Sequence, residues 1–214
     1  PAAPGLPRPG GFVSDDLYDI SPTLFGRTDN FIARATEFGS PSNYWHGVDV
    51  QVNARLRGGV TVQGGTSTGR VVNDTCELAI DNPSQYDCHK AYPFQTDIRG
   101  MAIYTVPKID VQLSGTMQSR PGPEILAQWN VPASLIAQSL GRAPSGSVAN
   151  IQTNILTAGE LYGDRITQVD MRIAKLLRFG RTRTNVGIDI YNLFNSNVPL
   201  TYVNVYGTTW GNPQ

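Results

Sequence analysis

The stretch VGIDIYNLFNSN, residues 186 to 197, alternates apolar and polar side chains and then ends in asparagines. Val186, Ile188 and Ile190 occupy every second position, so an extended chain places their side chains on one face and the polar side chains on the other. In a soluble sandwich the apolar face would cover a core, whereas in a membrane barrel it would meet lipid. The stretch therefore predicts a strand that ends among the asparagines, and two architectures can hold such a strand.

The composition favours an all-β fold. The 214 residues include 22 Gly and 15 Pro, which leaves little room for long helices. No stretch approaches the roughly 20 consecutive apolar residues of a transmembrane helix. Lys and Arg number 17, as do Asp and Glu, so no basic surface is expected to neutralise a phosphate backbone. We therefore expect a β-rich chain without a nucleic-acid partner.

Residues 1 to 30 are rich in Pro and Gly and show no sustained periodicity. We expect an irregular segment there, with one short edge strand over DLYDI, 16 to 20. The chain begins PAAPGLPRPG, with neither an initiator Met nor a signal sequence. We therefore expect a processed product or a fragment of a longer protein, in which residues 31 to 214 form the β domain.

Alternation recurs along the β domain in long segments joined by short turns. A single strand is predicted over FIARATEF, 31 to 38. Three hairpins are then predicted, which pair 44 to 56 with 60 to 70, 99 to 106 with 109 to 119, and 165 to 177 with 183 to 194. Segments of about 12 residues are longer than ordinary soluble strands, and when tilted they would cross the ~25 Å apolar band of a membrane barrel.

Long connections separate the hairpins, over 71 to 98 and over 121 to 164. Compact soluble domains rarely contain structureless connections beyond about 12 to 15 residues, whereas membrane barrels have short turns at one rim and long loops at the other. The loop lengths therefore favour an antiparallel meander of about eight long strands that is part of a transmembrane β-barrel. Extracellular loops are expected at these two connections and from 195 onward.

In such a barrel the polar face of each strand would line the interior. The residues expected there are Asp49, Gln51, Asn53, Arg55, Asp110, Gln112, Asp170, Arg172 and Asp189. Both charge signs occur in this set. It would form either a polar wall that contacts a plug or a passing substrate, or a cross-strand charge network that solvates the interior.

Aromatic residues fall at the ends of the predicted strands. Those expected at a membrane interface are Tyr44, Trp45, Tyr162, Tyr191 and Phe194 beside long connections, and Tyr104 and Phe179 near short turns. Two aromatic girdles at two interfaces would give this placement. The alternative is that the same side chains cap the ends of a sandwich core.

The two cysteines, Cys76 and Cys88, lie close together in CELAIDNPSQYDC. An even pair in a turn-rich segment predicts a disulfide-closed loop in an oxidising compartment, which would stabilise by roughly 3 kcal/mol on the chain-entropy estimate. Two free thiols, or a metal site that uses His89, remain as alternatives. Acidic and amide side chains of the same loop would be calcium ligands or, equally simply, solvated loop residues.

The residues 65 to 69, GTSTG, match the G-x-S-x-G spelling of a hydrolase nucleophile elbow. That elbow requires a strand that turns sharply into a helix, and no helical period follows Gly69. No H-E-x-x-H, P-loop, dinucleotide-binding or C-x-x-C pattern occurs. We therefore expect no enzyme and no cofactor, and a hydrolase built around Ser67 serves only as a contrast.

Four blocks of the sequence carry a family resemblance: YWHGVDVQVNARLRGGVTVQGGTSTGR, YTVPKIDVQLSGTMQSRPGP, LYGDRITQVDMRIAKLLRFGRTRTNVGIDIYNLFNSN and YGTTW. Together they resemble the C-terminal barrel region of TonB-dependent outer-membrane receptors. The nearest resemblance is to the Oar-like receptors, which carry a carboxypeptidase-regulatory-like domain. It runs over residues 31 to 210, and the block that contains YNLFN is its most specific part.

The resemblance implies a barrel of about 22 strands in the outer membrane of a Gram-negative-type bacterium. It also implies an N-terminal plug and ligand uptake driven by TonB and the proton-motive force. This chain contains no recognisable plug or TonB box, and it ends at GNPQ, where the family continues to a closing strand with an aromatic end.

The function implied is that of barrel wall and surface ligand-capture loops. The implied partners are outer-membrane lipid, the rest of the barrel and plug, TonB through the missing N-terminal region, and an unidentified extracellular ligand. The alternative is a soluble extracellular β-sandwich that acts as a binding or adhesion module.

Overall fold

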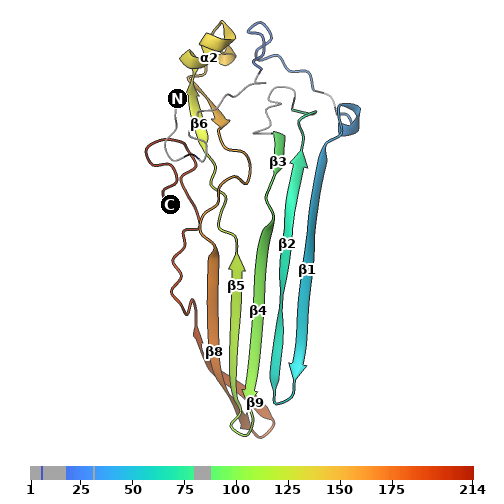
Figure 1. Ribbon diagram of the computed structural model, residues 1–214, viewed down its shortest axis with the longest axis vertical. Coiled ribbons are helices and arrows are strands. Elements are labelled where there is room, and N and C mark those ends of the chain that lie inside the picture. The colour runs from blue at the N-terminus through green and yellow to red at the C-terminus, as the bar shows by residue number, and fades with distance from the viewer. Residues whose placement is uncertain (1–5, 7–17, 31, 80–87) are drawn as a thin grey trace.

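The computed structural model describes residues 6, 18 to 30, 32 to 79 and 88 to 214. Its main feature is a seven-stranded sheet in the order β1-β2-β4-β5-β8-β9, with β3 paired to the end of β2. The strands are β1 (Ser42–Leu56), β2 (Val60–Asp74), β3 (His89–Ala91), β4 (Gln95–Val106), β5 (Val111–Arg120), β8 (Ile166–Phe179) and β9 (Thr182–Ile190). Neighbouring strands are antiparallel, so the predicted all-β meander is confirmed. In the described residues the sheet is open, with β1 and β9 at its edges (Figure 1).

Three hairpins build the sheet, as the alternation predicts: β1 with β2, β4 with β5, and β8 with β9. Their short turns lie together at one end of the sheet, the turn end, and the long connections lie at the other, the loop end (Figure 1). Gly58 and Gly59 in the first turn have φ of 89° and 87°. Glycine adopts this left-handed backbone without a steric penalty, which is why the Arg-Gly-Gly sequence closes the hairpin tightly.

A smaller folded unit, here called the cap, lies at the loop end (Figure 1). It consists of β6 (Gln128–Pro132), α2 (Ala133–Leu140), η2 (Ser145–Ser147) and β7 (Asn150–Asn154), with β6 and β7 paired antiparallel. The C-terminal segment joins it through a parallel bridge between Gln128 and Val205. Its core is made of Leu6, Ala127, Ile155 and Leu156, with Trp129, Leu161, Tyr206 and Trp210 packed against them. Among the described residues, α2 included, no helix is long and apolar enough to cross a membrane.

Several local predictions are wrong. The described part of the segment predicted as a strand over 31 to 38 contains only a short 3-10 helix, η1 (Ala35–Glu37), because no neighbouring strand among the described residues accepts its backbone hydrogen bonds. Residues 16 and 17 lie outside the described residues, and 18 to 20 form no strand. The first long connection is shorter than predicted, since β2 continues to Asp74 and β4 begins at Gln95. The second connection holds most of the cap.

Candidate functional site

The strand register places most of the predicted interior residues on one face of the sheet, here called the polar face. Residues directly opposite each other in an antiparallel pair share a face. One such row crosses all six long strands through Arg55, Thr61, Ile103, Ser114, Arg172 and Asp189. Neighbouring rows of the same face contain Asp49, Gln51, Asn53, Gln112 and Asp170.

Asp110 is the exception among the predicted interior residues. β5 begins at Val111, and Asp110 lies in the preceding turn with φ of 51°. Its carboxylate accepts a hydrogen bond of 3.0 Å from Arg178 Nη2 on β8. The prediction that Asp110 belongs to the strand is wrong because the turn includes residues 109 and 110 and so extends two residues further than the alternation indicates.

Charged residues of the polar face pair with one another. Arg172 Nη1 donates across the β8–β9 hairpin to both carboxylate oxygens of Asp189, at 3.0 and 2.9 Å. Arg99 donates from Nε and Nη2 to Asp97 on its own strand, at 2.9 and 3.4 Å. Exposed pairs of this kind contribute less than about 1 kcal/mol each, so their main effect is to balance charge on this face.

The opposite face of the sheet, here called the apolar face, is exposed. Val48 is 66% and Ile188 is 73% exposed. Further exposed side chains on this face are Val50, Val52, Leu56, Tyr104, Leu113, Met117, Ile173, Val186 and Ile190. No described helix or second sheet covers them, and the clustered core belongs to the cap. Contiguous apolar surfaces of this kind mark contact with protein or membrane.

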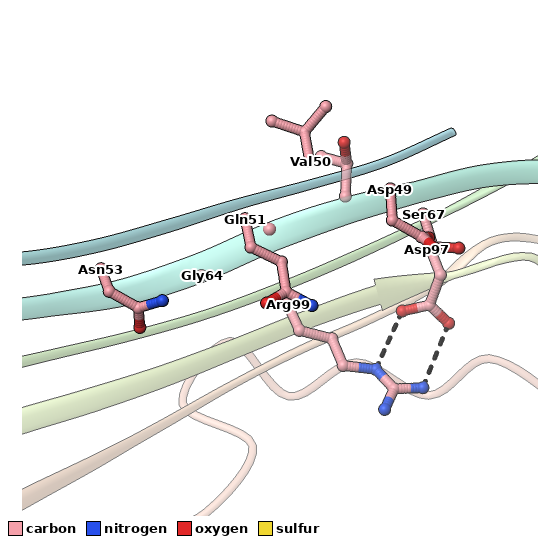
Figure 2. Close-up of a pocket in the computed structure, with 10 residues that line it drawn as sticks. Asp49, Val50, Gln51, Asn53, Gly64, Ser67, Asp97 and Arg99 are labelled. Atoms are coloured by element: carbon pink, nitrogen blue, oxygen red, sulfur yellow. Dashed lines mark hydrogen bonds and ion pairs between the residues drawn. The ribbon is translucent and has the colours of Figure 1, made fainter. Parts of the chain in front are cut away.

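A groove of about 520 Å³, here called the polar groove, runs along β1, β2 and β4 on the polar face. Asp49, Gln51, Asn53, Ser67, Asp97 and Arg99 supply its polar lining. Figure 2 shows the Asp97–Arg99 pair on one side of the sheet and Val50 on the other. Gly65 helps to form the floor, because a Cβ at this position would lie 2.4 Å from the carbonyl oxygen of Val50.

A second cavity, of about 510 Å³, lies at the loop end and is here called the aromatic hollow. It shares Ser67 and Asp97 with the polar groove, so the two cavities adjoin each other. Its aromatic lining is Trp45, Tyr92 and Tyr162, and its polar lining includes Arg70, Gln95 and Glu124. These residues come from β1, β2, β4 and two connections that are distant in the sequence.

Trp45 lies on the same side of β1 as Asp49, because the two are an even number of positions apart. Its indole fills the space above a pair of facing glycines, Gly47 and Gly69. A Cβ on Gly47 would lie 2.2 Å from the Trp45 ring, and one on Gly69 would lie 2.3 Å from it. The two glycines therefore make the seat for Trp45.

Tyr162 is the most strongly perturbed titratable group described. Burial, together with the nearby Glu124 carboxylate and the Tyr92 hydroxyl, raises the pKa of Tyr162 to about 12. A hydrogen bond between Tyr162 and the Gln95 side chain opposes this rise. Tyr162 is therefore a neutral hydrogen-bonding group at any physiological pH.

The other aromatic residues of the predicted interface set lie near the two ends of the strands. Tyr104 and Phe179 are near the turn end, and Phe179 is exposed. Tyr191 and Phe194 follow β9 and are also exposed. Tyr44, whose ring centroid lies 4.8 Å from that of His46, is the third residue of β1. Of the predicted set, Trp45 and Tyr162 instead line the aromatic hollow.

Cys76 and Cys88 form the predicted disulfide, with their Cα atoms 4.7 Å apart. The alternatives of free thiols and of a cysteine-based metal site are thereby excluded. His89 Nδ1 instead lies 2.8 Å from a carboxylate oxygen of Asp74. Of the remaining acidic and amide residues of this loop, Glu77 accepts a hydrogen bond of 2.6 Å from the backbone N–H of Ser40, and those at 81, 82, 85 and 87 lie outside the described residues.

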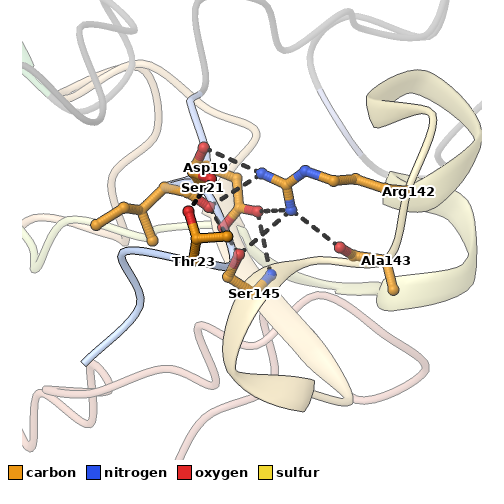
Figure 3. Close-up of polar contacts among 7 residues, drawn as sticks. Asp19, Ser21, Thr23, Arg142, Ala143 and Ser145 are labelled. Atoms are coloured by element: carbon orange, nitrogen blue, oxygen red, sulfur yellow. Dashed lines mark hydrogen bonds and ion pairs between the residues drawn. The ribbon is translucent and has the colours of Figure 1, made fainter. Parts of the chain in front are cut away.

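A hydrogen-bonded cluster attaches the N-terminal segment to the cap (Figure 3). Arg142 donates to the Asp19 carboxylate, to the carbonyl oxygens of Asp19 and Ile20, and to Ser145 Oγ. The backbone N–H of Ser145 also donates to Asp19, at 3.1 Å. Partial burial raises the pKa of Asp19, but the hydrogen bonds from Ser145 and Arg142 outweigh it and hold the pKa below its usual range.

Ser67 lies inside β2, with strand residues on both sides, and not at a strand-to-helix turn. The geometry of a nucleophile elbow is therefore absent at this serine. Within the described part of the chain, no group of three or more His, Cys, Asp or Glu side chains is placed to hold a metal ion.

The polar groove and the aromatic hollow contain residues that the sequence-based prediction missed. Arg99 begins the strand predicted over 99 to 106 and Asp97 lies two residues before it, so the alternation of that strand, extended by two residues, places both on the polar face. Tyr92 and Glu124 lie in connections, where periodicity gives no signal. Only the folded chain brings them beside Trp45.

No family model matches the chain, and neither a curated protein nor a solved structure is significantly similar to it. The function must therefore be inferred from the geometry of the two sheet faces and of the cavities at the loop end.

Proposed function

We propose that this chain forms part of the wall of a β-barrel in a bacterial outer membrane, within a TonB-dependent receptor. The apolar face meets lipid, the polar face lines the interior, and the cap and connections form the surface that captures ligand. One observation carries the proposal: a long sheet exposes its apolar face while its opposite face is polar and charge-paired. In lipid, an exposed apolar face is the stable arrangement.

Strand length supports this reading. β4 has 12 residues and β1 has 15. Twelve residues at ~3.3 Å each, tilted by about 40°, rise about 30 Å, which covers the ~25 Å apolar band of an outer-membrane barrel.

The offset between strands supports it as well. The row that passes through Leu56 and Val60, at the end of the first hairpin, continues to Ile173 in β8. β8, however, extends beyond this row to Phe179 before its own turn. Because all three turns lie at the same end, the rows run obliquely and the strands are tilted, as closure of a barrel requires.

The open edges of the sheet indicate the partners. β1 and β9 each pair on one side only among the described residues, which leaves backbone donors and acceptors along the other side. Such groups are very unfavourable in lipid unless further strands pair with them. The partners proposed from these edges are further barrel strands, and the family resemblance adds a plug against the polar face and TonB acting through the plug region.

The alternative is a soluble β-sandwich that acts as a binding or adhesion module. It would need a second sheet packed over the apolar face. Within the described residues the remaining sheet, β6 with β7, belongs to the cap. Contact with lipid therefore accounts for the exposed apolar face without a second protein layer packed over it.

Nitroxide scanning along β9 tests the proposal. Single cysteines replace residues 184 to 190 in turn, with the native disulfide intact, and the spin-labelled full chain is reconstituted in lipid vesicles. Accessibility to dissolved oxygen should peak at Val186, Ile188 and Ile190, while accessibility to a water-soluble nickel complex should peak at Asn185, Gly187 and Asp189. A chain that stays monomeric and folded in plain buffer, or a scan without a period of two, would contradict the proposal.

A further inference from the structure

The aromatic hollow has the size and chemistry of a ligand site. Its volume of about 510 Å³ falls within the range of small-molecule pockets, and its lining combines aromatic rings with a few convergent polar groups. We propose that the aromatic hollow and the polar groove together bind a neutral linear oligosaccharide. This inference rests on the proposed function, because the hollow opens to the cell exterior only if the loop end of the sheet lies on the outer side of the membrane.

The aromatic side chains suit the face of a sugar ring. Trp45, Tyr92 and Tyr162 approach from three different segments. A pyranose presents a face of C–H bonds, and the electron-rich face of an aromatic ring attracts such weakly positive hydrogens while excluding water. Trp45 is 48% exposed although its indole is seated on two glycines, so it presents a held and accessible surface.

The polar side chains suit hydroxyl groups. Gln95 offers both donors and acceptors, and Glu124 and Asp97 offer acceptors. Glu124 is already oriented, because its Oε1 accepts a hydrogen bond of 2.6 Å from the backbone N–H of Gly159. Hydroxyl groups on adjacent sugar carbons can donate to such fixed oxygens in pairs.

The charges around the hollow favour a neutral ligand over an anion. The guanidinium of Arg70 lies 5.2 Å from the centre of the Phe94 ring, where it is held by a cation–π contact. Arg99 is paired with Asp97. Arg165, in an adjoining hollow, donates to Ser119 and to the carbonyl oxygen of Thr96. The lining of the aromatic hollow itself contains one arginine, Arg70, against two carboxylates, Asp97 and Glu124, so it offers no cationic cluster for a phosphate or carboxylate.

The shape favours a chain of sugar units over a single ring. The polar groove adjoins the hollow at the shared residues Ser67 and Asp97. Asp49, Gln51 and Asn53 follow at every second position of β1, which places a hydrogen-bonding group about every 7 Å along the groove. A ligand whose first ring stacks on Trp45 would extend its further hydroxyl groups along this row.

Binding experiments on the full chain test this inference. The chain is placed in lipid vesicles or in a detergent without a sugar headgroup, since a maltoside would compete. Calorimetric titrations use cellotriose, maltotriose and chitotriose as neutral probes, spermidine as the cationic probe and citrate as the anionic probe. We expect saturable binding of at least one trisaccharide and none of citrate.

Variants locate the site. Trp45→Ala should weaken trisaccharide binding by about tenfold or more, which corresponds to the loss of one stacking surface. Tyr162→Phe keeps the ring and removes only the hydroxyl, so it should weaken trisaccharide binding by a smaller factor than Trp45→Ala. If Trp45→Ala fails to fold, Tyr162→Phe tests whether the hollow is the binding site. Tyr191→Ala removes an exposed aromatic residue outside the hollow and should leave the affinity unchanged.

The outcomes separate this inference from the proposed function. A chain that inserts in lipid but binds no trisaccharide overturns the inference and leaves the barrel proposal standing. Tight binding of spermidine that is lost in Trp45→Ala would assign the hollow to a cation instead. A chain whose β9 scan lacks the period of two fails the barrel proposal, whatever it binds.

Discussion

The sheet and the cap place their apolar side chains differently. In the cap, Ala127, Ile155 and Leu156 are each no more than 5% exposed and pack in one cluster. In the sheet, Val48 and Ile188 are mostly exposed although they belong to the longest regular structure of the chain. A sheet that leaves its apolar face open depends for its stability on whatever covers that face, whereas the cap carries its own small core.

A charge on the apolar face should have the largest effect on the stability of the sheet. Ile188→Arg should destabilise the chain in lipid vesicles by up to about 4 kcal/mol, because a charge near the bilayer centre loses its hydration. Asn185→Arg places the same charge on the polar face of the same strand and should cost far less. Urea unfolding in vesicles measures both, and equal effects would show that lipid does not cover the apolar face.

The stability of the cap is tested by removing a buried side chain from its core rather than by adding a charge. Leu156→Ala should destabilise the cap by about 2 to 3 kcal/mol, toward the lower end for buried leucines because the core has few members. Leu135→Ala, at an exposed position of α2, should change stability by less than about 0.5 kcal/mol.

Amide hydrogen exchange measures this second effect separately in cap and sheet. Faster exchange in β6 and β7 with unchanged exchange in β4 and β5 would confirm that the two units are stabilised independently. Loss of protection throughout the sheet would instead show that the cap and the sheet unfold as one cooperative unit.

The difference between the sheet and the cap also explains which parts of the fold could be predicted from the sequence. The hairpins and the two faces depend on a period of two, which is local, so VGIDI predicts both a strand and the side on which Asp189 lies. The strand ends at Ile190, and Asn192 and Asn195 then adopt positive φ of 51° and 54°. Asparagine tolerates that conformation better than most residues, which accounts for the asparagines after the strand.

The cap could not be predicted in this way. β6 pairs with β7 across α2, and Gln128 pairs with Val205 from the far end of the chain. Neither contact follows from alternation over a few neighbouring residues. The aromatic hollow contains both predictable and unpredictable residues. Trp45 lies on the same side of β1 as Asp49 because the two are four positions apart, whereas Tyr162 reaches the hollow only through tertiary structure.

The smallest expected effect concerns the attachment of the N-terminal segment to the cap. The pKa of Asp19 is held below its ordinary value of 3.8, so its contacts with Arg142 and Ser145 contribute above that value and are lost as the pH falls through the lowered pKa. In an NMR titration, the amide of Ser145 should therefore shift with a midpoint below 3.8. Arg142→Gln removes the cation and should move the midpoint upward, whereas Arg120→Gln, outside the cluster, should not. An unchanged midpoint in Arg142→Gln would mean that the backbone N–H of Ser145 alone holds Asp19 ionised, and the attachment would then depend on the cap's backbone rather than on the arginine.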